Sequence, residues 1–460
     1  MRMNEAPGSF RDPSGRVYVH EGRILRSIGE SYSPHWERAV SSGLLKALTE
    51  TGRLVSYMDI PALPDSWKSV EVEKIPFISY PYEWSFEQLR AAALLTLDIQ
   101  KECLSRGMSL KDASAFNVQF QGARPLFIDL LSFECREPTA PWQAYRQFCM
   151  HFLAPLALYS RTPELSRLSS LWIDGIPLNC AWKLLPWRSA LSPGLQIHLH
   201  LHAKAEKKHG DAQKAVEKVK KMTVSTQALI DLADSLTRTI EALPAPGSPG
   251  EWTEYYCDTN YSQKAEQAKA DIVSTSAARA GGALGMDLGA NTGKFSRILA
   301  EHFSYVIAAD IDAQAVGKHY SNLIAGGAQN ILPLVLDLSN PSPAIGWACS
   351  ERFSWMQRTK ADFICALALT HHLFFTYGIP WDRQAAFFAE CLTPGGHLVV
   401  EFVPPDDSQV RRLLAARDDV FADYHLEGMR KAFSSHFTEL SVNPLPESQR
   451  CLLEFKKSTP

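Results

Sequence analysis

The stretch MDLGANTGKFSRILAEHFSYVIAADID, which covers Met286–Asp312, decides the fold of the C-terminal half of the chain. An apolar strand runs into Asp287, a glycine-containing turn follows, and a helix opens near Gly293. A second apolar strand ends at Asp310. This order of elements is typical of a nucleotide-binding βαβ unit. Asn291 stands where a dinucleotide-binding turn has its middle glycine, so the turn is poorly suited to a pyrophosphate.

The residues at the strand ends indicate a nucleoside ligand without phosphates. Gly289 lets the chain turn sharply after the first strand, and Gly293 permits close approach where the helix begins. The Asp310 carboxylate can accept both hydroxyls of a ribose. Asp337, at the end of a third strand, can accept from an adenine amino group, and Leu338 beside it can pack against the base. A ribose and an adenine without phosphate point to S-adenosylmethionine.

Strands and helices alternate through the C-terminal half, which predicts a parallel, doubly wound α/β sheet. In such a sheet the ligand binds beyond the carboxyl ends of the strands, where the strand order reverses. Two final apolar runs, separated only by a short turn, predict a terminal antiparallel hairpin. The expected strands are Ala283–Leu288, Tyr305–Ala309, Ile331–Leu336, Asp362–Leu369, His397–Phe402, Phe437–Val442 and Cys451–Phe455.

Five motifs in order resemble the class I S-adenosylmethionine-dependent methyltransferases: DLGANTG (Asp287–Gly293), AADID (Ala308–Asp312), LDL (Leu336–Leu338), ADFICALALTHHL (Ala361–Leu373) and LTPGGHLVVEF (Leu392–Phe402). The run EFVPPDDSQVRRLL further resembles methyltransferases associated with rhizobial nodulation. The resemblance implies a seven-stranded Rossmann-like sheet that binds the methionine end of the cofactor near Asp287 and Gly289, the ribose on Asp310 and the adenine near Asp337. It also places Asn291, Gly293, Ile311, Leu338 and Tyr261 in the cofactor site.

Each acidic residue also has a structural interpretation. Asp287 could cap the turn that follows it, and Asp337 could cap a helix. Asp312 is expected to be the N-cap of the next helix and not a cofactor contact. Tyr261 and Tyr256 belong to EYYCDTNYS (Glu254–Ser262), which looks like an entry segment folded over the cofactor. Either tyrosine could contact the cofactor, although aromatic packing would explain them equally well.

The base for methyl transfer is expected after the fourth strand, where this family faces its substrate. His371 and His372 are the candidates, with packed or capping histidines as the alternative, and Glu401 is a weaker candidate. The Asn-Pro-Pro-Tyr and Pro-Cys motifs of DNA methyltransferases are absent from the sequence, which disfavours DNA and leaves small molecules, peptides and RNA as acceptors. The alternative functions are a scaffold that binds the cofactor without turnover and a bifunctional enzyme whose N-terminal region is a kinase-like phosphotransferase domain.

The N-terminal region contains a second candidate site. Asp112 and Asn117 precede an apolar run that ends in Asp129. This pattern resembles the catalytic and metal loops of protein kinases and aminoglycoside phosphotransferases, which implies an α+β kinase-like domain with a possible nucleotide and magnesium site. A glycine-rich loop and a clear phosphate-binding lysine are missing from the sequence; Arg26 is the nearest cation. We expect this domain to bind a substrate or partner; an ordinary loop ordered by its acids is the alternative.

Composition sets the broad class. The 460 residues imply at least two domains, and a net charge of −3 favours neither nucleic acid nor acidic membranes as partners. Nine scattered cysteines and an N-terminus without an apolar core predict a cytoplasmic protein. The proline- and glycine-rich stretch near residue 245 divides the chain into a kinase-like domain (1–202), a helical connector and linker (203–250) and a methyltransferase domain (251–460).

Three alternating histidines, His198, His200 and His202, lack other ligands nearby, so no metal site is predicted.

Overall fold

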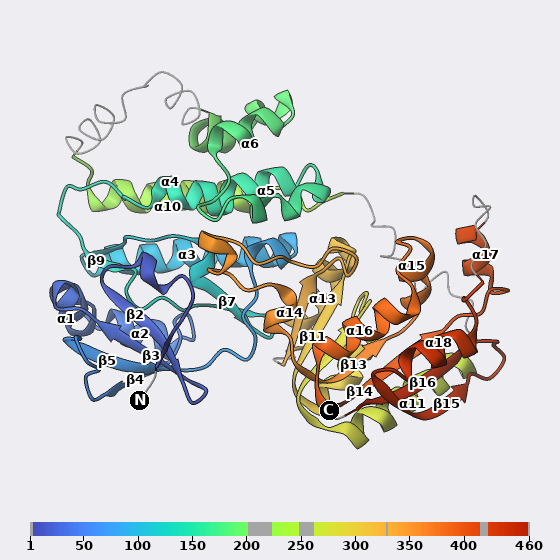
Figure 1. The fold of residues 1–460 in the computed structure, drawn as a ribbon. Helices are drawn as coiled ribbons and strands as arrows, with labels where there is room; N and C mark the ends of the chain where they lie inside the picture. The colour runs from blue at the N-terminus through green and yellow to red at the C-terminus, as the bar shows by residue number, and fades with distance from the viewer. Residues whose placement is uncertain (1–2, 201–222, 248–261, 328–329, 415–421, 459–460) are drawn as a thin grey trace. The chain divides into compact units, whose positions relative to one another are not determined.

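The computed structural model describes residues 3–200, 223–247, 262–327, 330–414 and 422–458 (Figure 1). The chain divides into two compact units. The N-terminal unit contains Met1–Ser248 together with Ala344–Arg352, and the C-terminal unit contains Pro249–Pro343 together with Phe353–Pro460. None of the described helices combines the length and the apolar composition that a membrane span requires.

The C-terminal unit is built on a seven-stranded sheet in the order β12-β11-β10-β13-β14-β16-β15. The first five strands of this order are parallel, and β16 pairs antiparallel with both β14 and β15. Strand order reverses between β11 and β13, which lie on opposite sides of β10. The strands are β10 (Gly282–Leu288), β11 (Phe303–Asp310), β12 (Ile331–Val335), β13 (Ala361–Ala366), β14 (Leu392–Phe402), β15 (Phe437–Pro444) and β16 (Cys451–Lys457).

The mostly parallel sheet and its terminal hairpin confirm the predicted architecture. Consecutive residues of the central strands are buried, as in Leu398, Val399 and Val400, because successive side chains point to opposite faces and both faces are covered. The fourth predicted strand was too long. It ends at Ala366, because Ala368 adopts a left-handed conformation with φ 48°, which an extended strand cannot include.

Helices of the C-terminal unit begin at residues that the sequence marks as caps. Ser262 caps α11 by accepting the amide of Ala265 at 3.2 Å. Asp312 accepts the amides of Gln314 and Ala315 and caps α13, as predicted. The helices are α11 (Gln263–Ala280), α12 (Lys294–Ala300), α13 (Ala313–Gly326), α14 (Trp355–Arg358), α15 (Thr370–Phe375), α16 (Trp381–Cys391), α17 (Ser408–Leu414) and α18 (Leu426–Phe433).

The N-terminal unit begins with an antiparallel five-stranded sheet in the order β1-β2-β3-β5-β4. A long helix, α3 (Phe86–Ser105), follows it and precedes two short antiparallel ladders, β6-β9 and β7-β8. The strands are β1 (Asn4–Glu5), β2 (Gly15–His20), β3 (Arg23–Ile28), β4 (Tyr57–Ile60), β5 (Lys68–Val72), β6 (Met108–Leu110), β7 (Val118–Gln121), β8 (Arg124–Phe127) and β9 (Phe133–Cys135), with α1 (Ser33–Ser41) and α2 (Leu44–Glu50) between β3 and β4.

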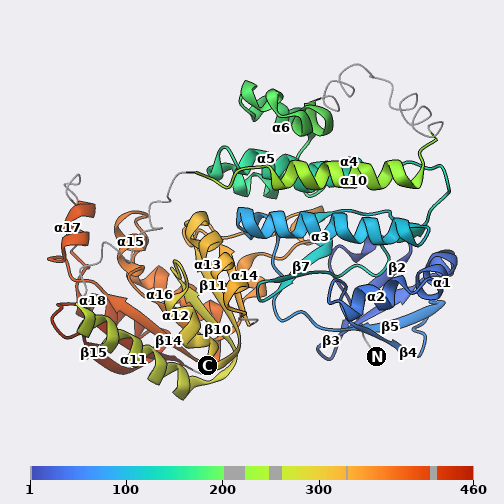
Figure 2. The same cartoon turned by 180° about the vertical axis from the view of Figure 1, so that it is seen from behind.

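Helix α10 of this unit packs beside α3. Figures 1 and 2 show α10 (Thr226–Glu241) running alongside α3, and Lys101 of α3 lies 3.2 Å from Asp234 of α10. The described part of the predicted connector therefore belongs to the N-terminal unit, while residues 203–222 lie outside the described residues. The other helices are α4 (Tyr145–Phe148), α5 (Ala154–Tyr159), α6 (Leu178–Leu184) and α7 (Pro193–Leu195).

His198 and His200 lie on a helical turn, Gln196–His200, and not on an extended segment. His198 bridges the hydroxyls of Tyr145, at 2.8 Å, and Ser235, at 2.9 Å. These bonds join three helical segments, so His198 has a packing role; His202 lies outside the described residues.

Candidate active site

The two predicted carboxylates lie at the carboxyl ends of neighbouring parallel strands. Asp287 is near the end of β10, Asp310 ends β11, and Asp287 lies in register with Ala308. Asp310 accepts the backbone amide of Asn291 at 2.7 Å and that of Asp312 at 2.8 Å. Its two oxygens are thus held in place and still have free lone pairs, because an ionised carboxylate has about four acceptor sites.

The turn between β10 and α12 uses three left-handed residues, Gly289 (φ 78°), Asn291 (φ 48°) and Gly293 (φ 83°). The amides of Gly289 and Ala290 both point to the carbonyl of Ala309, at 2.8 and 3.1 Å, so the turn is bonded to the end of β11. Asn291 tolerates the left-handed region better than most side chains. Its presence therefore fits the turn as well as a glycine would.

Gly293 is required by packing as well as by backbone conformation. A Cβ atom at this position would lie 2.0 Å from Nε2 of His319, a buried residue of α13. The turn can approach α13 closely only because this Cβ is absent. Sequence alone predicted close approach here, and the structure identifies the neighbour.

Burial makes both carboxylates unusual acids. It raises the pKa of Asp287 to about 6, against a hydrogen bond from the Ser296 hydroxyl at 2.6 Å, and the charge of Asp310 adds to the rise. Burial likewise raises the pKa of Asp310 to about 6, although the amides of Asp312 and Asn291 oppose it. At neutral pH both groups are ionised, and they form a negative site suited to a cationic ligand.

Residues expected near the adenine lie at the next strand ends. Ile311, which follows β11, is 46% exposed, which is unusual for an isoleucine beside buried strands and leaves an apolar surface available. Asp337 and Leu338, just beyond β12, are half-buried. Asp337 accepts the amide and hydroxyl of Ser339, at 2.9 and 2.6 Å. It therefore caps a turn, and its contact with adenine stays a prediction.

The loop after β13 brings the candidate bases to the same edge of the sheet. His371 and His372 lie in α15, with ring centroids 4.2 Å apart. His371 is only 2% exposed, and its Nδ1 has no hydrogen-bond partner among the described residues. Burial lowers the pKa of His371 well below its ordinary value, and burial lowers that of His372 to about 4. Both rings are therefore neutral at pH 7.

Glu401 is not available as a base. Its side chain is fully buried at the end of β14, where it accepts Nζ of Lys269 at 2.7 Å and the amide of Ala368 at 2.8 Å. A guanidinium nitrogen of Arg450 lies 3.6 Å from its other oxygen. These contacts hold the left-handed Ala368 in place, so Glu401 shapes the loop that leads to His371.

Two residues of this site were not foreseen, Ser296 and Lys269. Ser296 orients Asp287 from the first turn of α12, and Lys269 pairs with Glu401 from α11. Lys269 shares a buried helical face with Ala265 and Val273, four residues before and after it. A lysine at the centre of an apolar stripe is a signal for a buried ion pair, and the sequence contained it.

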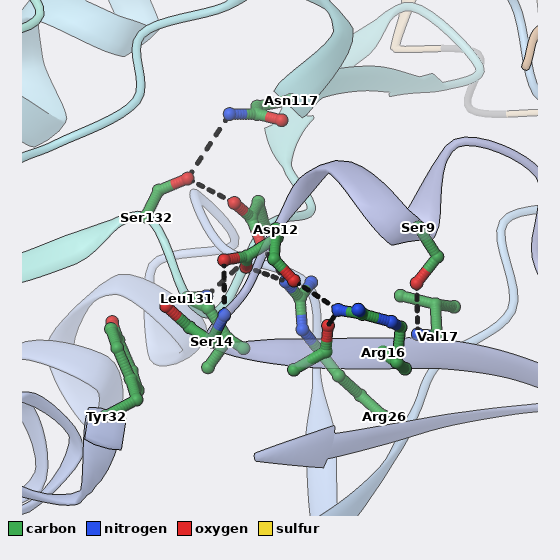
Figure 3. Close-up of polar contacts among 12 residues, drawn as sticks. Ser9, Asp12, Ser14, Arg16, Val17, Arg26, Tyr32, Asn117, Leu131 and Ser132 are labelled. Atoms are coloured by element: carbon green, nitrogen blue, oxygen red, sulfur yellow. Dashed lines mark hydrogen bonds and ion pairs between the residues drawn. The ribbon is translucent and has the colours of Figure 1, made fainter. Parts of the chain in front are cut away.

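Two of the N-terminal candidates, Asn117 and Asp129, are linked through Ser132 beside the β3 residue Arg26; Figure 3 shows Asn117, Ser132 and Arg26. Arg26 forms an ion pair with Asp129, and its other carboxylate neighbour is Asp12, at 3.4 Å. The hydroxyl of Ser132 donates to Asp129 and accepts the amide of Asn117 at 3.2 Å. Asp12 and Ser132 carry no motif of their own, which is why they were missed.

The charges in this cluster are already balanced by protein groups. Burial opposes ionisation of Asp129, but the Arg26 charge outweighs it, so the pKa of Asp129 is lowered. Burial, with the nearby Asp129 charge, raises the pKa of Asp112, whose carboxylate accepts the Ser114 amide at 2.9 Å and the Gln147 amide at 2.8 Å. Across the described ranges, the structure contains no group of three metal-ligating acids, histidines or cysteines.

Tyr261, the last predicted cofactor contact, lies outside the described residues, as does most of its segment. The remaining residues are compatible with S-adenosylmethionine: a left-handed turn with glycines at Gly289 and Gly293, two buried carboxylates for a cationic nucleoside, and an exposed apolar side chain, Ile311, where the adenine is predicted.

Comparison with known proteins agrees with this geometry. Residues 261–440 match a family model described as a methyltransferase domain. The whole chain is similar to the nodulation protein NoeA of Rhizobium meliloti strain 1021, with 34% identity over 485 aligned residues that cover 99% of this chain and 97% of that protein. The chain belongs to the NoeA family. This protein is therefore an S-adenosylmethionine-dependent methyltransferase, with its methyltransferase domain in the C-terminal half of the chain.

Solved structures similar to this NoeA-family chain cover less of it. The N-methyltransferase NodS from Bradyrhizobium japonicum WM9 is 17% identical, with 43% of this chain and 98% of that chain covered and a TM-score of 0.32. The magnesium protoporphyrin IX methyltransferase ChlM from Synechocystis PCC 6803 is 16% identical, with 45% and 92% covered and a TM-score of 0.32.

Proposed function

We propose that this protein transfers the methyl group of S-adenosylmethionine to a nucleophilic atom of an acceptor other than DNA, with His371 accepting the acceptor's proton. One observation carries the proposal. The buried carboxylates of β10 and β11 lie at the strand-order switch, and the next strand across it, β13, leads into the helix that contains His371. Cofactor and base are thus expected at one edge of the sheet.

Bound S-adenosylmethionine supplies an electrophilic methyl group on a sulfonium. The protein's own groups hold the nucleoside: Asp310 accepts the ribose hydroxyls, Ile311 covers the adenine, and the Gly289 turn leaves room for the methionine end. Asp287 and Asp310 supply negative charge to a cationic ligand. A buried carboxylate has a larger effect on such a ligand than an exposed one, because the surroundings screen it less.

His371 supports the catalytic part of the proposal because Nδ1 is a buried polar atom without a partner among the described residues. Leaving such an atom unpaired costs about 1–3 kcal/mol, so the site favours a ligand that donates to it. The neutral imidazole can accept a proton from an acceptor hydroxyl or amine at Nδ1. Its lowered pKa keeps it in this neutral form throughout the neutral range.

Radiolabel transfer tests the proposal. The purified protein is incubated with methyl-labelled S-adenosylmethionine and fractions of an extract of the source cells, and S-adenosylhomocysteine is measured. The product should form only with both protein and extract, and more slowly with His371→Ala. Cofactor binding without product in any fraction would favour the alternative, a scaffold that senses S-adenosylmethionine.

By extension from its NoeA relative, we propose that the acceptor is a compound used in nodulation.

We also propose that the N-terminal unit is kinase-like in fold and acts in binding rather than in phosphate transfer. A five-stranded antiparallel sheet, a long helix and two short ladders around Asp112, Asn117 and Asp129 support the first part. The second part rests on Arg26, whose ion pair occupies the Asp129 carboxylate that a magnesium ion would need.

Calorimetry with magnesium and ATP tests the role of this unit. The wild-type protein should show no binding up to millimolar ATP. Arg26→Ala, which frees Asp129, provides the comparison. Micromolar, magnesium-dependent ATP binding by the wild type would contradict a binding-only role.

A further inference from the structure

A short segment of the C-terminal half of the chain is built into the N-terminal unit. The chain leaves the C-terminal unit after Pro343, contributes Ala344–Arg352 to the N-terminal unit, and returns at Phe353. The excursion lies between β12 and β13 of the methyltransferase sheet. Its base is closed by a hydrogen bond from the amide of Trp355 to the carbonyl of Ser342, at 2.9 Å. The segment is therefore a loop that one unit presents and the other contains.

An ion pair holds one side of this loop. Arg11 donates to both oxygens of Glu351, from Nε at 2.6 Å and from Nη2 at 3.0 Å. The Glu351 side chain is fully buried, and the hydrogen bond with Arg11 lowers the pKa of Glu351. Arg11 also lies 3.3 Å from Asp174. A two-bond guanidinium–carboxylate contact with a buried partner is among the stronger and more specific polar contacts in proteins.

A cation–π contact holds the other side. The Arg352 guanidinium lies 4.5 Å from the centre of the Phe116 ring, and burial lowers the pKa of Arg352. Gly8 makes room for it, since a Cβ atom on Gly8 would lie 2.6 Å from Nη1 of Arg352. Phe116 is next to Asn117, so the loop lies against the segment that carries the N-terminal candidate residues.

The loop has an ordered shape of its own. The amides of Glu351 and Arg352 both point to the carbonyl of Ile345 at 3.1 Å, and the amide of Ile345 points to the carbonyl of Arg352 at 3.1 Å. Glu351 also accepts the amide of Trp347 at 2.7 Å. Ala348 adopts a left-handed conformation, φ 52°, which costs about 1–2 kcal/mol and persists only where contacts enforce it.

We propose that Ala344–Arg352 is a docking loop by which the methyltransferase domain holds the N-terminal unit without relying on the covalent linker. The surface of the N-terminal unit that receives the loop is formed by Gly8, Arg11, Phe116 and Asp174. The connection is short: the loop begins seven positions after Asp337, and Pro341 and Pro343 stiffen the approach. The proposal does not depend on the methyl acceptor or on any activity of the N-terminal unit.

A full-length chain with a protease site inserted between Ala245 and Pro246 tests the docking loop. After cleavage, the two halves of the wild-type protein should co-elute on size exclusion, and analytical ultracentrifugation gives their dissociation constant. Arg11→Gln and Glu351→Gln should each raise that constant at least about tenfold, because each leaves a charge without its partner. The double variant should be no weaker than the worse single variant, since both remove one shared contact.

Arg23→Gln is the matched control. Arg23 makes an equivalent pair with Glu71 in the same unit, at 2.9 Å from Nε to Oε1, but does not touch the loop, so its dissociation constant should be unchanged. Circular dichroism melting of the uncut chains checks that each variant folds. Halves that separate in the wild type, or additive effects of Arg11→Gln and Glu351→Gln, would overturn the proposal.

Discussion

Replacement of Asp310 by alanine tests the assignment of the ribose site. The carboxylate holds two backbone amides, those of Asn291 and Asp312, and is predicted to accept ribose hydroxyls on its remaining lone pairs. Each hydrogen bond to a charged group contributes about 1.5–3 kcal/mol. Loss of even one such bond weakens binding at least about tenfold, since 1.4 kcal/mol is one decade. We therefore expect Asp310→Ala to raise the dissociation constant for S-adenosylmethionine by 1–2 decades, as roughly estimated from these bonds.

Stability should change much less than affinity. Two buried amides lose their acceptor, which costs about 1–3 kcal/mol each. Against this, burial raises the pKa of Asp310 to about 6, so the ionised carboxylate itself destabilises the folded domain at neutral pH. These terms largely offset each other, so the folded domain should survive the substitution.

Isothermal titration with S-adenosylmethionine and S-adenosylhomocysteine measures the effect. Asp312→Ala is the matched control, because it removes a carboxylate two residues away that caps α13. It should cost about 1 kcal/mol of stability and leave affinity within about twofold. The assignment would be refuted if Asp310→Ala bound within threefold of wild type, or if both variants lost affinity equally.

Three further outcomes follow from the site. Asp287 and Asp310, whose pKa values are raised to about 6, keep their protons in the folded state between about pH 4 and 6, where the unfolded chain releases them. As pH rises through that window, their contribution to the free energy of unfolding should fall, whereas the affinity for the cofactor should rise because the carboxylates become charged. An affinity that does not change from pH 5 to 8 would exclude this role. His371→Ala should slow turnover by roughly 100-fold with cofactor affinity within about twofold, as expected for loss of a general base, whereas unchanged turnover would make the ring a packing residue. Gly293→Ala should lower the free energy of unfolding by at least about 2 kcal/mol in a denaturant titration, because the new Cβ atom clashes with His319 and the backbone is left-handed. Gly327 is also left-handed but has open space around it, so Gly327→Ala should lower the free energy of unfolding by only about 1 kcal/mol; equal losses in the two variants would contradict the packing argument.

The C-terminal fold was predictable because its signals are local. Apolar runs mark buried parallel strands, and Asp312 follows a strand and opens a helix, so its capping role could be predicted from sequence. The end of β13 could not be placed, because the left-handed Ala368 donates its amide to Glu401, which is distant in sequence. Local propensity carries no information about such a contact.

Pairings between distant residues escaped prediction for the same reason. Arg11 and Glu351 are ordinary charged residues in sequence, and only the fold brings them together. The long interval between β12 and β13 was the available signal, since connections in such sheets are usually short. In the N-terminal unit, the grouping of Asp112, Asn117 and Asp129 was anticipated, whereas the Arg26 ion pair that balances Asp129 depends on three-dimensional placement.

The most direct test of the central claim is a titration of the wild-type protein with S-adenosylmethionine and, separately, with NAD. Asn291 in place of a middle glycine disfavours a pyrophosphate, and the buried Asp287 and Asp310 favour a cationic nucleoside. Micromolar binding of S-adenosylmethionine with no detectable binding of NAD is the expected result. Binding of NAD without S-adenosylmethionine would contradict the assignment of this site.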